Sequence, residues 1–564
     1  MKKASVALLV ALVTAMFAPF PSSANTEDYL NSVTTQGDEW FIYASERPLF
    51  GIHSGLALQP GSVNEGEKRG DWVFCQDAND PTCSSEVALK SIIATSMLPH
   101  CGATSSEICI ESLELAKSGE PFELADYVSE TEHPLSFPGD ESKNLLDGRG
   151  IPLFRSPNLS NSSGNNDFGV AIRVTQFWDF EKSQFKAHML EAELVPYFAP
   201  PSNQSWGCVV VSGETCGKSA NFLPDSQVRL SFRLPSTIGG WFSGRMKDPL
   251  LSVEALSSRV NRIVVQSEPV EVAALGLVKS GSELSSKERT WVENNGSGAL
   301  GFTRFTGANS WQENIFPFIE NYRSQANDTA IGTDLVWKMR TVPTGYASQC
   351  LADTSKVYGL VTTNALGYET GAPSYKDGFL DYKVAGLHYL PGGKVLVIGT
   401  YDLIMDSEAA RCIYGFSRAP ISATVTVVGD NGEENVATTV VSERDGWLKL
   451  AAYGFTFSEK EIKVRVTQPQ IRTLSLYSGR ATALTNQQKA QIRATLEKGD
   501  GNTKFICTGI RYFNQPVSEN ILVRKRAKLA CEYAKSIRPD LSYWFQTKTT
   551  QARSYNGRVL VVSK

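Results

Sequence analysis

Two pairs of acidic residues have a spacing that could support hydrolysis of a glycosidic bond. Asp179 and Glu181, and likewise Glu191 and Glu193, are two residues apart in segments typical of β-strands, so each pair shares one face of a sheet. Glycoside hydrolases use two carboxyl groups in this chemistry. Acidic side chains that face solvent from a sheet are far more common, so these pairs do not identify an enzyme.

Motifs of other catalytic and metal-binding classes are missing from the sequence. GIHSG, residues 51–55, places its serine one position too late for a nucleophile elbow, and no HExxH, Walker or dinucleotide-binding motif occurs. DANDPTC, residues 77–83, resembles a calcium loop but lacks its glycine and final glutamate, so a disulfide-closed turn is the better interpretation. The sequence predicts no metal and no cofactor, and it favours a non-enzymatic protein while leaving a hydrolase open.

A basic segment near the C-terminus, residues 520–537, is a candidate binding surface. Helical periodicity gathers its apolar residues on one face and places Arg524, Lys528 and Lys535 on the other. Arg526 falls inside the apolar face. A guanidinium there must reach a carboxylate, a carbonyl or a ligand, because burying it unpaired is too costly.

Charge is unevenly distributed along the chain. Residues 471–564 contain 17 Lys and Arg but five Asp and Glu, a net charge of +12. The whole chain carries −4, so residues 1–470 carry −16. This asymmetry suggests an anionic partner for the C-terminal segment, such as wall polymer, lipid headgroups or extracellular nucleic acid. For any single charge, a solvated surface is the simpler explanation.

The first 24 residues have the pattern of an export signal: MKK, then the apolar run ASVALLVALVTAMFAPF, then PSSA before a cleavage site near Ala24. Lipid attachment there is not expected, because the first cysteine is Cys75. No later segment approaches the roughly 20 apolar residues that span a bilayer. We therefore expect an exported protein, extracellular or associated with the cell wall, without a transmembrane segment.

The ten cysteines fit an oxidising compartment. Three pairs are eight residues apart, and up to five disulfides are expected. Zinc is the alternative, but no CxxC occurs and the five histidines are scattered. The candidate pairs are Cys75 and Cys83, Cys101 and Cys109, Cys208 and Cys216, Cys350 and Cys412, and Cys507 and Cys531.

The chain of 564 residues is too long for one ordinary core, so we expect a multidomain, mostly β protein. Residues 25–135 are predicted to form a cysteine-stapled α/β module, with helices in SSEVALKSIIATSML (84–98) and SEICIESLELAKSG (106–119). Residues 136–415 read as one or two β-sandwich-like modules, and residues 416–470 as a small β unit.

After Pro469 the pattern alternates between strands and helices. TLSLYS, KFICTGIRY, LSYWFQ and GRVLVVS are typical of strands, whereas LTNQQKAQIRATLEKG and Glu519–Ile537 are typical of amphipathic helices. The order strand, helix, strand, helix, strand, strand predicts a two-layer α/β sandwich over residues 471–564.

Two motifs in this last domain carry a family resemblance. LVRKRAKLACEYA (522–534) and NGRV (556–559) are similar to the Leu-Ser-x-x-Arg-Ala-x-x-Val-x-x-Tyr-Leu helix and the closing Asn-x-Arg-Val of the OmpA-like C-terminal domain. The CTG after the strand and the second cysteine in the helix resemble a variant found at the ends of secreted actinobacterial proteins. The resemblance implies non-covalent binding to peptidoglycan, and it also implies that Cys507 and Cys531 lie close enough to bond.

The resemblance assigns the candidate ligand-binding residues, which are Arg526, Arg558, Arg511 and Tyr512. Arg526 matches the arginine that grips the diaminopimelate side chain, but Tyr512 stands where the family has its aspartate. The acceptor for the ligand's ammonium is thus missing. This departure suggests a cationic surface that holds peptidoglycan or another anionic glycan by charge, or a domain that has lost binding and in which Arg526 only ties a turn.

Together these features predict an exported, non-enzymatic protein of the cell wall or surface. Its basic C-terminal domain would dock to the anionic envelope, and its β-rich body would bind an unknown partner or be displayed outward. No specific nucleic acid is expected. The alternative is a secreted hydrolase with an unrecognised active site in residues 25–470.

Overall fold

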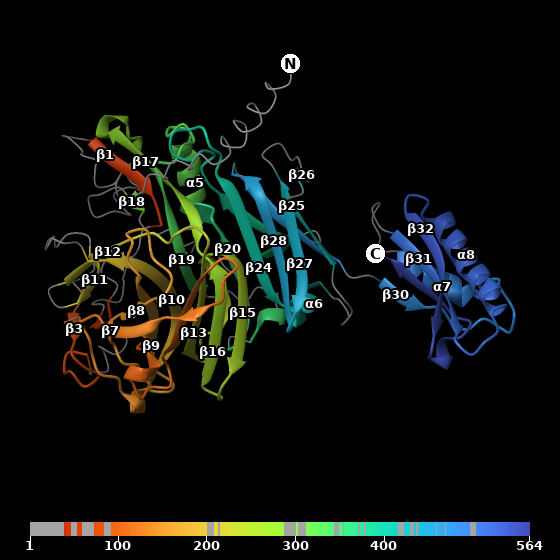
Figure 1. Ribbon diagram of the computed structural model, residues 1–564, viewed down its shortest axis with the longest axis horizontal. Helices are drawn as coiled ribbons and strands as arrows, with labels where there is room; N and C mark the ends of the chain where they lie inside the picture. The colour runs from red at the N-terminus through yellow and green to blue at the C-terminus, as the bar shows by residue number, and fades with distance from the viewer. Residues whose placement is uncertain are drawn as a thin grey trace, which may run out of the picture. The chain divides into compact units, whose positions relative to one another are not determined.

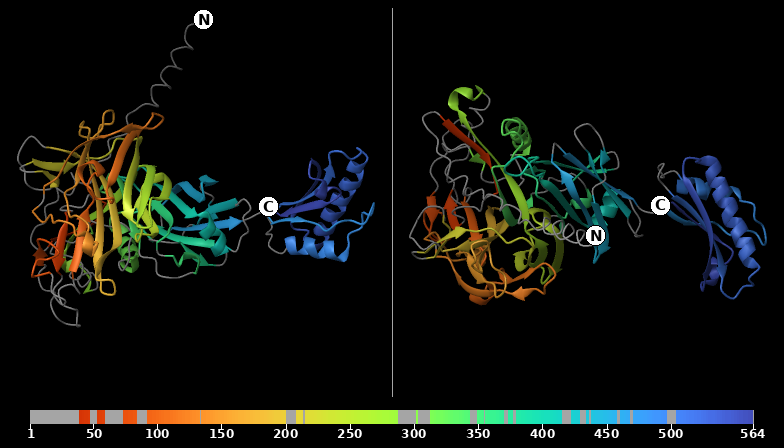
Figure 2. Two further views of the ribbon diagram at one scale, coloured as in Figure 1. Left: turned by 90° about the horizontal axis from the view of Figure 1, so that it is seen from below. Right: turned by 45° about the horizontal axis from the view of Figure 1, so that its top comes forward.

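The protein is described from a computed structural model (Figures 1 and 2). The described residues are 39–46, 53–58, 73–83, 92–132, 134–199, 208–212, 215–286, 301–302, 312–342, 349–353, 355–369, 373–376, 379–414, 422–428, 434–435, 438–457, 460–467, 470–496 and 504–563. The predicted export signal, residues 1–24, lies outside them.

The described part of the chain is mostly β, with 51% of its residues in strands, as predicted. It divides into two compact units, residues 1–413 with 425–464 and residues 414–424 with 465–564. The helices of the described residues are α5 (Gln312–Arg323), α6 (Ser407–Tyr414), α7 (Asn486–Leu496), α8 (Glu519–Ile537) and the short 3-10 turns η2 (Cys101–Ala103), η3 (Glu141–Lys143), η4 (Gly281–Glu283), η6 (Gln349–Leu351) and η7 (Arg553–Tyr555).

The larger unit is built around a branched sheet of 18 strands. Most of its strand pairs are antiparallel, and the longest ladder joins β9 to β10 through a bulge. Its strands are β1 (Glu39–Ala44), β2 (Gly55–Leu58), β3 (Val73–Cys75), β4 (Ile92–Met97), β7 (Asp126–Glu130), β8 (Pro152–Arg155), β9 (Asp167–Asp179), β10 (Gln184–Phe198), β11 (Cys208–Ser212), β12 (Thr215–Ser219), β14 (Gly240–Arg245), β17 (Val270–Ser280), β18 (Gly301–Phe302), β19 (Gly332–Val342), β20 (Val357–Thr363), β24 (Ile398–Asp406), β27 (Thr438–Arg444) and β28 (Trp447–Thr456).

Two smaller sheets are formed largely by residues of this unit. A five-stranded sheet has the order β15-β16-β13-β5-β6, and a six-stranded sheet has the order β21-β23-β29-β25-β26, with β22 also paired to β23. Their strands are β5 (Ile110–Lys117), β6 (Glu123–Leu124), β13 (Ser226–Pro235), β15 (Lys247–Ala255), β16 (Val260–Glu268), β21 (Gly367–Tyr368), β22 (Ser374–Lys376), β23 (Phe379–Ala385), β25 (Ser422–Val428), β26 (Glu434–Asn435) and β29 (Lys460–Thr467).

The main core lies between the five-stranded sheet and the central strands of the large sheet. Leu230 and Phe232 on β13 contribute to the same buried cluster as Leu190 on β10, Phe242 on β14 and Trp337 on β19. Alternating residues of β13 are buried, which is the pattern of a strand with one face on a core. The sandwich-like arrangement expected from the strand-rich sequence is therefore present.

The helices predicted at residues 84–98 and 106–119 are wrong wherever the structure describes these segments. β4 and β5 occupy them instead. In β4 alternate side chains are buried, and β4 pairs with β9 while β5 pairs with β13. Strand pairing with distant segments overrides the local helical pattern, because local sequence preference alone stabilises a helix only weakly.

The same pairings correct the prediction of a separate α/β module at residues 25–135. β1 pairs with β17, β4 with β9 and β5 with β13, so the N-terminal strands complete sheets whose other strands come much later in the chain. A module with its own core would instead bury its apolar residues within one continuous segment.

The C-terminal unit is a two-layer α/β arrangement. Its four-stranded sheet has the order β30-β33-β31-β32, in which β31 and β32 are parallel and the other neighbours antiparallel. The helices α7 and α8 pack against the sheet (Figures 1 and 2), and α8 begins and ends at the residues predicted. The strands are β30 (Gln470–Thr473), β31 (Lys504–Tyr512), β32 (Ser542–Thr550) and β33 (Val559–Ser563).

Four of the five predicted cysteine pairs are confirmed as disulfides. Their Cα atoms are 6.1 Å apart for Cys75 and Cys83, 5.0 Å for Cys101 and Cys109, 5.7 Å for Cys350 and Cys412, and 5.8 Å for Cys507 and Cys531. The side chains of Cys208 and Cys216 lie outside the described residues, although their strands β11 and β12 pair. Within the described chain, no helix combines the length and apolar character needed to cross a membrane.

Candidate functional site

Arg526 points into the C-terminal unit and is 3% exposed. Its guanidinium is surrounded by main-chain carbonyls from three positions. Nε donates to the Ala481 oxygen at 2.8 Å, Nη1 to the Gly557 oxygen at 2.7 Å and Nη2 to the Gly479 oxygen at 2.5 Å. The partner that the sequence required for this buried charge is therefore a set of three main-chain carbonyls. Each of the three guanidinium nitrogens donates a hydrogen bond to one of them.

Backbone conformation at two glycines allows this arrangement. Gly479 and Gly557 have φ values of 49° and 75°, a region that side chains disfavour. A Cβ on Gly557 would also lie 2.9 Å from Nη1 of Arg526. The two loops that deliver carbonyls to Arg526 therefore both rely on glycine.

An aromatic ring covers the same guanidinium. The Tyr477 ring centre lies 4.5 Å from Cζ of Arg526. Burial lowers the pKa of Arg526, with the nearby Tyr477 opposing the effect, and burial raises the pKa of Tyr477 to about 12. Arginine remains charged in proteins, so this is a permanent cation stacked on a neutral ring.

The other three candidate residues meet at one end of the sheet. Arg511 and Tyr512 end β31, and the Ile510 amide donates to the Arg558 oxygen at 2.9 Å, which brings Arg558 beside them. All three are partly exposed. The Arg511 guanidinium donates to the Gln515 oxygen, and the Tyr512 amide donates to Asn556 Oδ1 at 2.8 Å. Arg526 lies within the core while its three companions remain at the surface.

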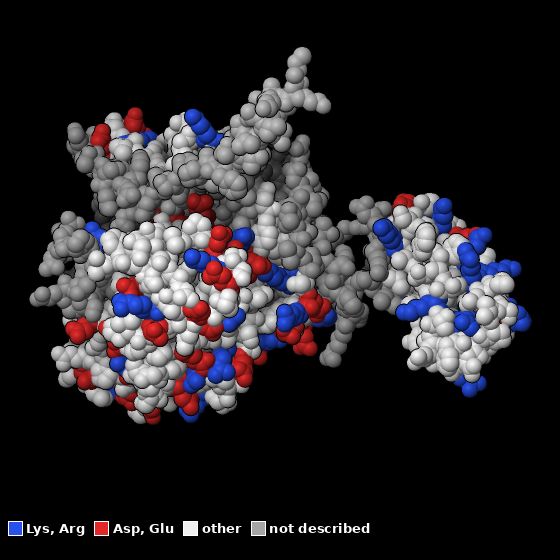
Figure 3. All heavy atoms as spheres, viewed as in Figure 1, with Lys and Arg blue, Asp and Glu red and all other residues white. Residues whose placement is uncertain are grey.

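Basic side chains are also exposed elsewhere on this unit. On α8 the side chains of Arg524, Lys525, Lys528 and Lys535 are exposed, and the acidic neighbour Glu532 lies 3.6 Å from Lys528. In Figure 3 the visible face of the C-terminal unit carries many Lys and Arg and few Asp and Glu. Further exposed basic residues of this unit are Arg472, Arg480, Arg493, Lys504, Lys548 and Arg553.

Apolar side chains are exposed beside these charges. Val517 is 74% exposed in the connection between β31 and α8, Ile521 is 75% exposed in the first turn of α8, and Phe513 is 56% exposed just after β31. Trp544 on β32, the edge strand, is 67% exposed. The surface can therefore contact a partner through both charge and apolar area.

Of the four carboxylates weighed for hydrolysis, those of Glu191, Glu193 and Asp179 make structural contacts, whereas Glu181 is exposed. Glu191 forms ion pairs with Arg173 and Arg340 across neighbouring strands, and Glu193 lies 3.2 Å from Lys338 Nζ. Asp179 ends β9, and its Oδ1 accepts the Glu181 amide at 3.0 Å in the hairpin turn. None of these carboxylates faces a partner carboxylate across a cleft, as glycoside hydrolysis requires.

The ion pairs of β10 belong to a buried network. Glu46 Oε1 accepts from Arg245 Nη2 at 2.7 Å with both side chains fully buried, and Lys338 Nζ lies 3.8 Å from Glu46 Oε2. Arg245 also donates to main-chain oxygens, including that of Leu366 at 3.0 Å. Trp337 and Lys338 are neighbours on β19 and both are buried, so both faces of this strand are covered. No local pattern in the sequence marks Lys338 as buried.

A second buried polar cluster has no counterpart among the residues singled out from the sequence. Asp402 on β24 is fully buried, and its Oδ1 accepts from Tyr453 Oη at 2.6 Å while its Oδ2 accepts the Asp248 amide at 3.2 Å. Lys449 Nζ lies 4.0 Å from Asp402 Oδ1 and also contacts Asp248. Desolvation by burial raises the pKa of Asp402 to about 7. The sequence TYDLIMD gives no local sign of this environment.

This cluster joins two sheets. Asp248 is the second residue of β15 in the five-stranded sheet, whereas Asp402, Lys449 and Tyr453 lie on β24 and β28 of the large sheet. Asp402 is inaccessible to solvent, and its carboxylate already accepts hydrogen bonds from neighbouring donors. It is therefore suited to holding the sheets together and has no path to a substrate.

The segment resembling a calcium loop is a turn. Asp77 Oδ1 accepts the Asn79 amide at 2.6 Å and Asp80 Oδ1 accepts the Thr82 amide at 2.9 Å, inside the loop closed by Cys75 and Cys83. Among the described residues, no group of three or more His, Cys, Asp or Glu is arranged to hold a metal ion.

Comparison of the chain with protein-family models and with curated proteins finds no match.

Proposed function

We propose that this protein is exported and non-enzymatic, and that its C-terminal unit docks it to anionic polymer of the cell envelope by charge. The carrying observation is the exposed basic surface of that unit, which includes Arg524, Lys525, Lys528 and Lys535 on α8. The net charge of +12 over residues 471–564 supports the same partner class.

The likeness to OmpA-like domains supports peptidoglycan or another wall glycan as the polymer. The order of strands and helices agrees with that proposal, and so does a disulfide between β31 and α8. Tyr512 stands at the position where the family has an aspartate. Arg526 stands at the arginine position, but all three nitrogens of its guanidinium donate to main-chain carbonyls. We therefore propose docking through the exposed surface, with Arg526 serving the fold.

Export is supported by the pattern of residues 1–24 and by the four disulfides, which form and persist outside the cytosol. The larger unit would then be carried at the surface. Three of the four carboxylates weighed for a hydrolase, those of Glu191, Glu193 and Asp179, are held in ion pairs or a turn, which supports a binding or display role over catalysis.

Substitution of the outer face of α8 tests this proposal. The variant Arg524→Gln, Lys525→Gln, Lys528→Gln removes three exposed charges without touching the core. Basic residues near an anionic surface contribute about 1 kcal/mol each, so retention of the full chain on purified cell walls should weaken by roughly two orders of magnitude.

A matched control removes the same charge from the other unit. Lys182→Gln, Arg259→Gln, Lys394→Gln changes three exposed residues of the larger unit and should bind walls as the wild type does. Equal retention of the α8 variant and the wild type, or equal losses in both variants, would contradict docking through α8.

A further inference from the structure

The outer side of α8 begins with two aliphatic side chains that lie in water. Val517 is 74% exposed in the connection before the helix, and Ile521 is 75% exposed in its first turn. A single exposed aliphatic residue is ordinary on a protein surface. Two such residues side by side leave apolar area that burial against a partner would stabilise.

Backbone hydrogen bonds place Val517 and Ile521 next to each other. The Asn520 amide donates to the Val517 oxygen at 2.9 Å, and the Ile521 amide donates to the Ser518 oxygen at 3.2 Å. Ser518 itself has helical dihedral angles, so the chain is already wound before the helix begins at Glu519. Residues four apart in such a turn are neighbours, with about 6 Å between their Cβ atoms. The two side chains therefore form one apolar projection.

Basic side chains continue this side of the helix. At 100° per residue, the exposed side chains that share an arc of about 100° are Ile521, Arg524, Lys525, Lys528, Glu532 and Lys535. The buried residues of α8 occupy the opposite side. Four basic residues and one acidic residue give the exposed side a formal +3. We call Arg524, Lys525 and Lys528, which directly follow the projection, the basic row.

The connection that carries the projection is held in a fixed conformation. The Arg511 guanidinium donates to the Gln515 oxygen, and the Gln515 amide donates to the Tyr512 oxygen at 3.0 Å. Phe513, which is 56% exposed, lies in the same connection. A projection formed in advance lowers the ordering cost of binding.

A bilayer with anionic headgroups matches this order of side chains. Apolar residues can enter the boundary between headgroups and acyl chains, while lysine and arginine beside them attract lipid phosphate. A hydrophilic polymer would leave the aliphatic side chains in water, and protein interfaces rely more on tryptophan, tyrosine and arginine anchors. We infer that the outer side of α8 binds the surface of an anionic lipid bilayer, with Val517 and Ile521 inserted and the basic row on the headgroups. This contact goes beyond docking to wall polymer by charge.

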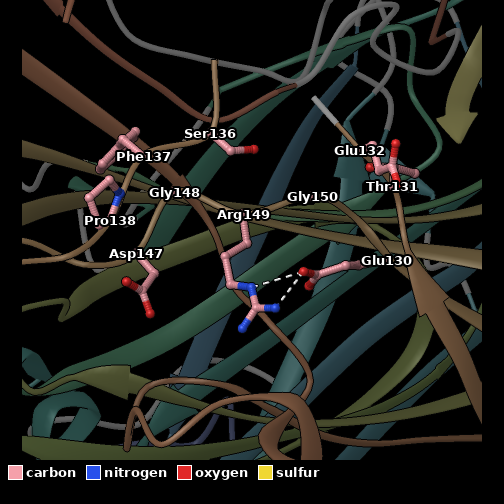
Figure 4. A pocket seen from close by; sticks show the side chains of 10 residues that line it. All are labelled: Glu130, Thr131, Glu132, Ser136, Phe137, Pro138, Asp147, Gly148, Arg149 and Gly150. Atoms are coloured by element: carbon pink, nitrogen blue, oxygen red, sulfur yellow. Dashed lines mark hydrogen bonds and ion pairs between the residues drawn. The ribbon is translucent and has the colours of Figure 1, made fainter. Parts of the chain in front are cut away.

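The cleft of the larger unit is unsuited to the same partner. It has a volume of about 630 Å³, and Figure 4 shows Arg149 and Glu130 facing each other in its lining. Arg149 Nε and Nη2 donate to Glu130 Oε1 at 2.9 and 2.5 Å. A Cβ on Gly150 would overlap the Thr131 oxygen, so two backbone segments approach closely here. A hollow with paired charges cannot insert into a flat bilayer, whereas the projection before α8 can.

Vesicles free of wall polymer test the inference on the full chain. Co-sedimentation with vesicles of equal parts phosphatidylglycerol and phosphatidylcholine, at about 0.1 M salt, measures the partition coefficient. Val517→Ser, Ile521→Ser should lower it by about tenfold or more, because the inserted apolar area is lost. The wild type should bind pure phosphatidylcholine vesicles about tenfold more weakly or worse, because the basic row then meets no anionic headgroup.

Leu124→Ser, Val395→Ser is the matched control. It removes two exposed aliphatic residues from the larger unit and should leave vesicle binding unchanged. Hydrogen exchange of the α8 amides shows whether the C-terminal unit of the first variant is folded. If that variant fails to fold, Ile521→Ser alone should still weaken binding severalfold.

The inference is overturned if the wild type does not sediment with the anionic vesicles, if the folded aliphatic variant binds them as tightly as the wild type, or if the control loses as much. Retention of Val517→Ser, Ile521→Ser on lipid-free cell walls should equal that of the wild type, and a loss there would place the two residues on the polymer instead. Because the vesicles hold no wall polymer and the walls no bilayer, failure of either proposal is seen separately from failure of the other.

Discussion

At the scale of single residues, the guanidinium of Arg526 links three chain segments of the C-terminal unit. Ala481 and Gly479 lie before α7, Gly557 lies before β33, and Arg526 itself is on α8. A flat group with donors in fixed directions suits three carbonyls, whereas a lysine ammonium cannot reach them in the same geometry.

Replacing Arg526 with Ala should therefore destabilise the C-terminal unit by about 3–5 kcal/mol, because three carbonyls lose their buried donor. Arg526→Lys should recover only part of this loss. Hydrogen exchange of the α8 amides in the full chain measures the effect. Among molecules that remain folded, wall retention should match the wild type. Unchanged exchange together with lost retention would instead show that Arg526 contacts the polymer.

Asp402 predicts a pH dependence in the larger unit. Its pKa is 3.8 in an ordinary setting and is raised to about 7 by burial, although Tyr453 and Lys449 oppose the shift. Below pH 3.8 the Asp402 carboxyl is protonated in both the folded and the unfolded chain, so its ionisation does not lower the free energy of unfolding. As the pH rises to about 7 the unfolded chain loses its proton first, so the free energy of unfolding falls, by roughly 4 kcal/mol in all.

Asp402→Asn removes this titration while keeping a side chain of the same shape. Its free energy of unfolding should be close to that of the wild type at about pH 4 and should exceed it at about pH 8. Denaturant unfolding of both proteins across that range gives the comparison, with Glu181→Gln as an exposed control. A wild-type decline that persists in Asp402→Asn would assign the pH dependence to another group.

At the scale of elements, α8 is held against the sheet by packing and by a covalent link. Ala527 and Ala530 are fully buried, and a Cβ on Gly509 of β31 would overlap the Val523 oxygen, so helix and strand approach closely. The disulfide between Cys507 and Cys531 spans 24 residues at this contact. It holds the basic face of α8 outward.

Removing that disulfide should loosen the unit without unfolding it in the cold. A loop of this length corresponds to about 3 kcal/mol of stabilisation. Cys507→Ala, Cys531→Ala should therefore show faster hydrogen exchange in α8 and β31, while the five-stranded sheet of the larger unit is unaffected. Equal exchange rates in both proteins would show that the link adds nothing to stability.

Local pattern predicts some elements and misleads at others for identifiable reasons. The apolar face of residues 520–537 predicts α8, and the need for a partner of Arg526 follows from the same helical wheel. β4 and β5 are mistaken for helices because their serines, glutamates and aliphatic residues also suit a helix, and their pairing with β9 and β13 cannot be seen locally. The identity of the Arg526 partners depends on loops far away in sequence, so no local pattern could supply it.

At the scale of the whole chain, charge asymmetry is readable from composition, whereas the architecture of the larger unit is not. Its sheets combine strands from residue 39 to residue 467, and such long-range pairing leaves little trace in any short segment. The cleft around Arg149 has the same origin. Only DGRG, residues 147–150, hints at it, since glycines on both sides of a charged residue indicate close approach of the backbone.

The most direct measurement of the central proposal is the dissociation constant of the full chain on purified cell walls as ionic strength rises. Screening shortens the reach of exposed charges from about 10 Å at 0.1 M to about 3 Å at 1 M salt. Docking by the basic surface predicts tight binding at low salt that weakens steadily and is lost at high salt. Binding that ignores salt, or no binding at low salt, would contradict it.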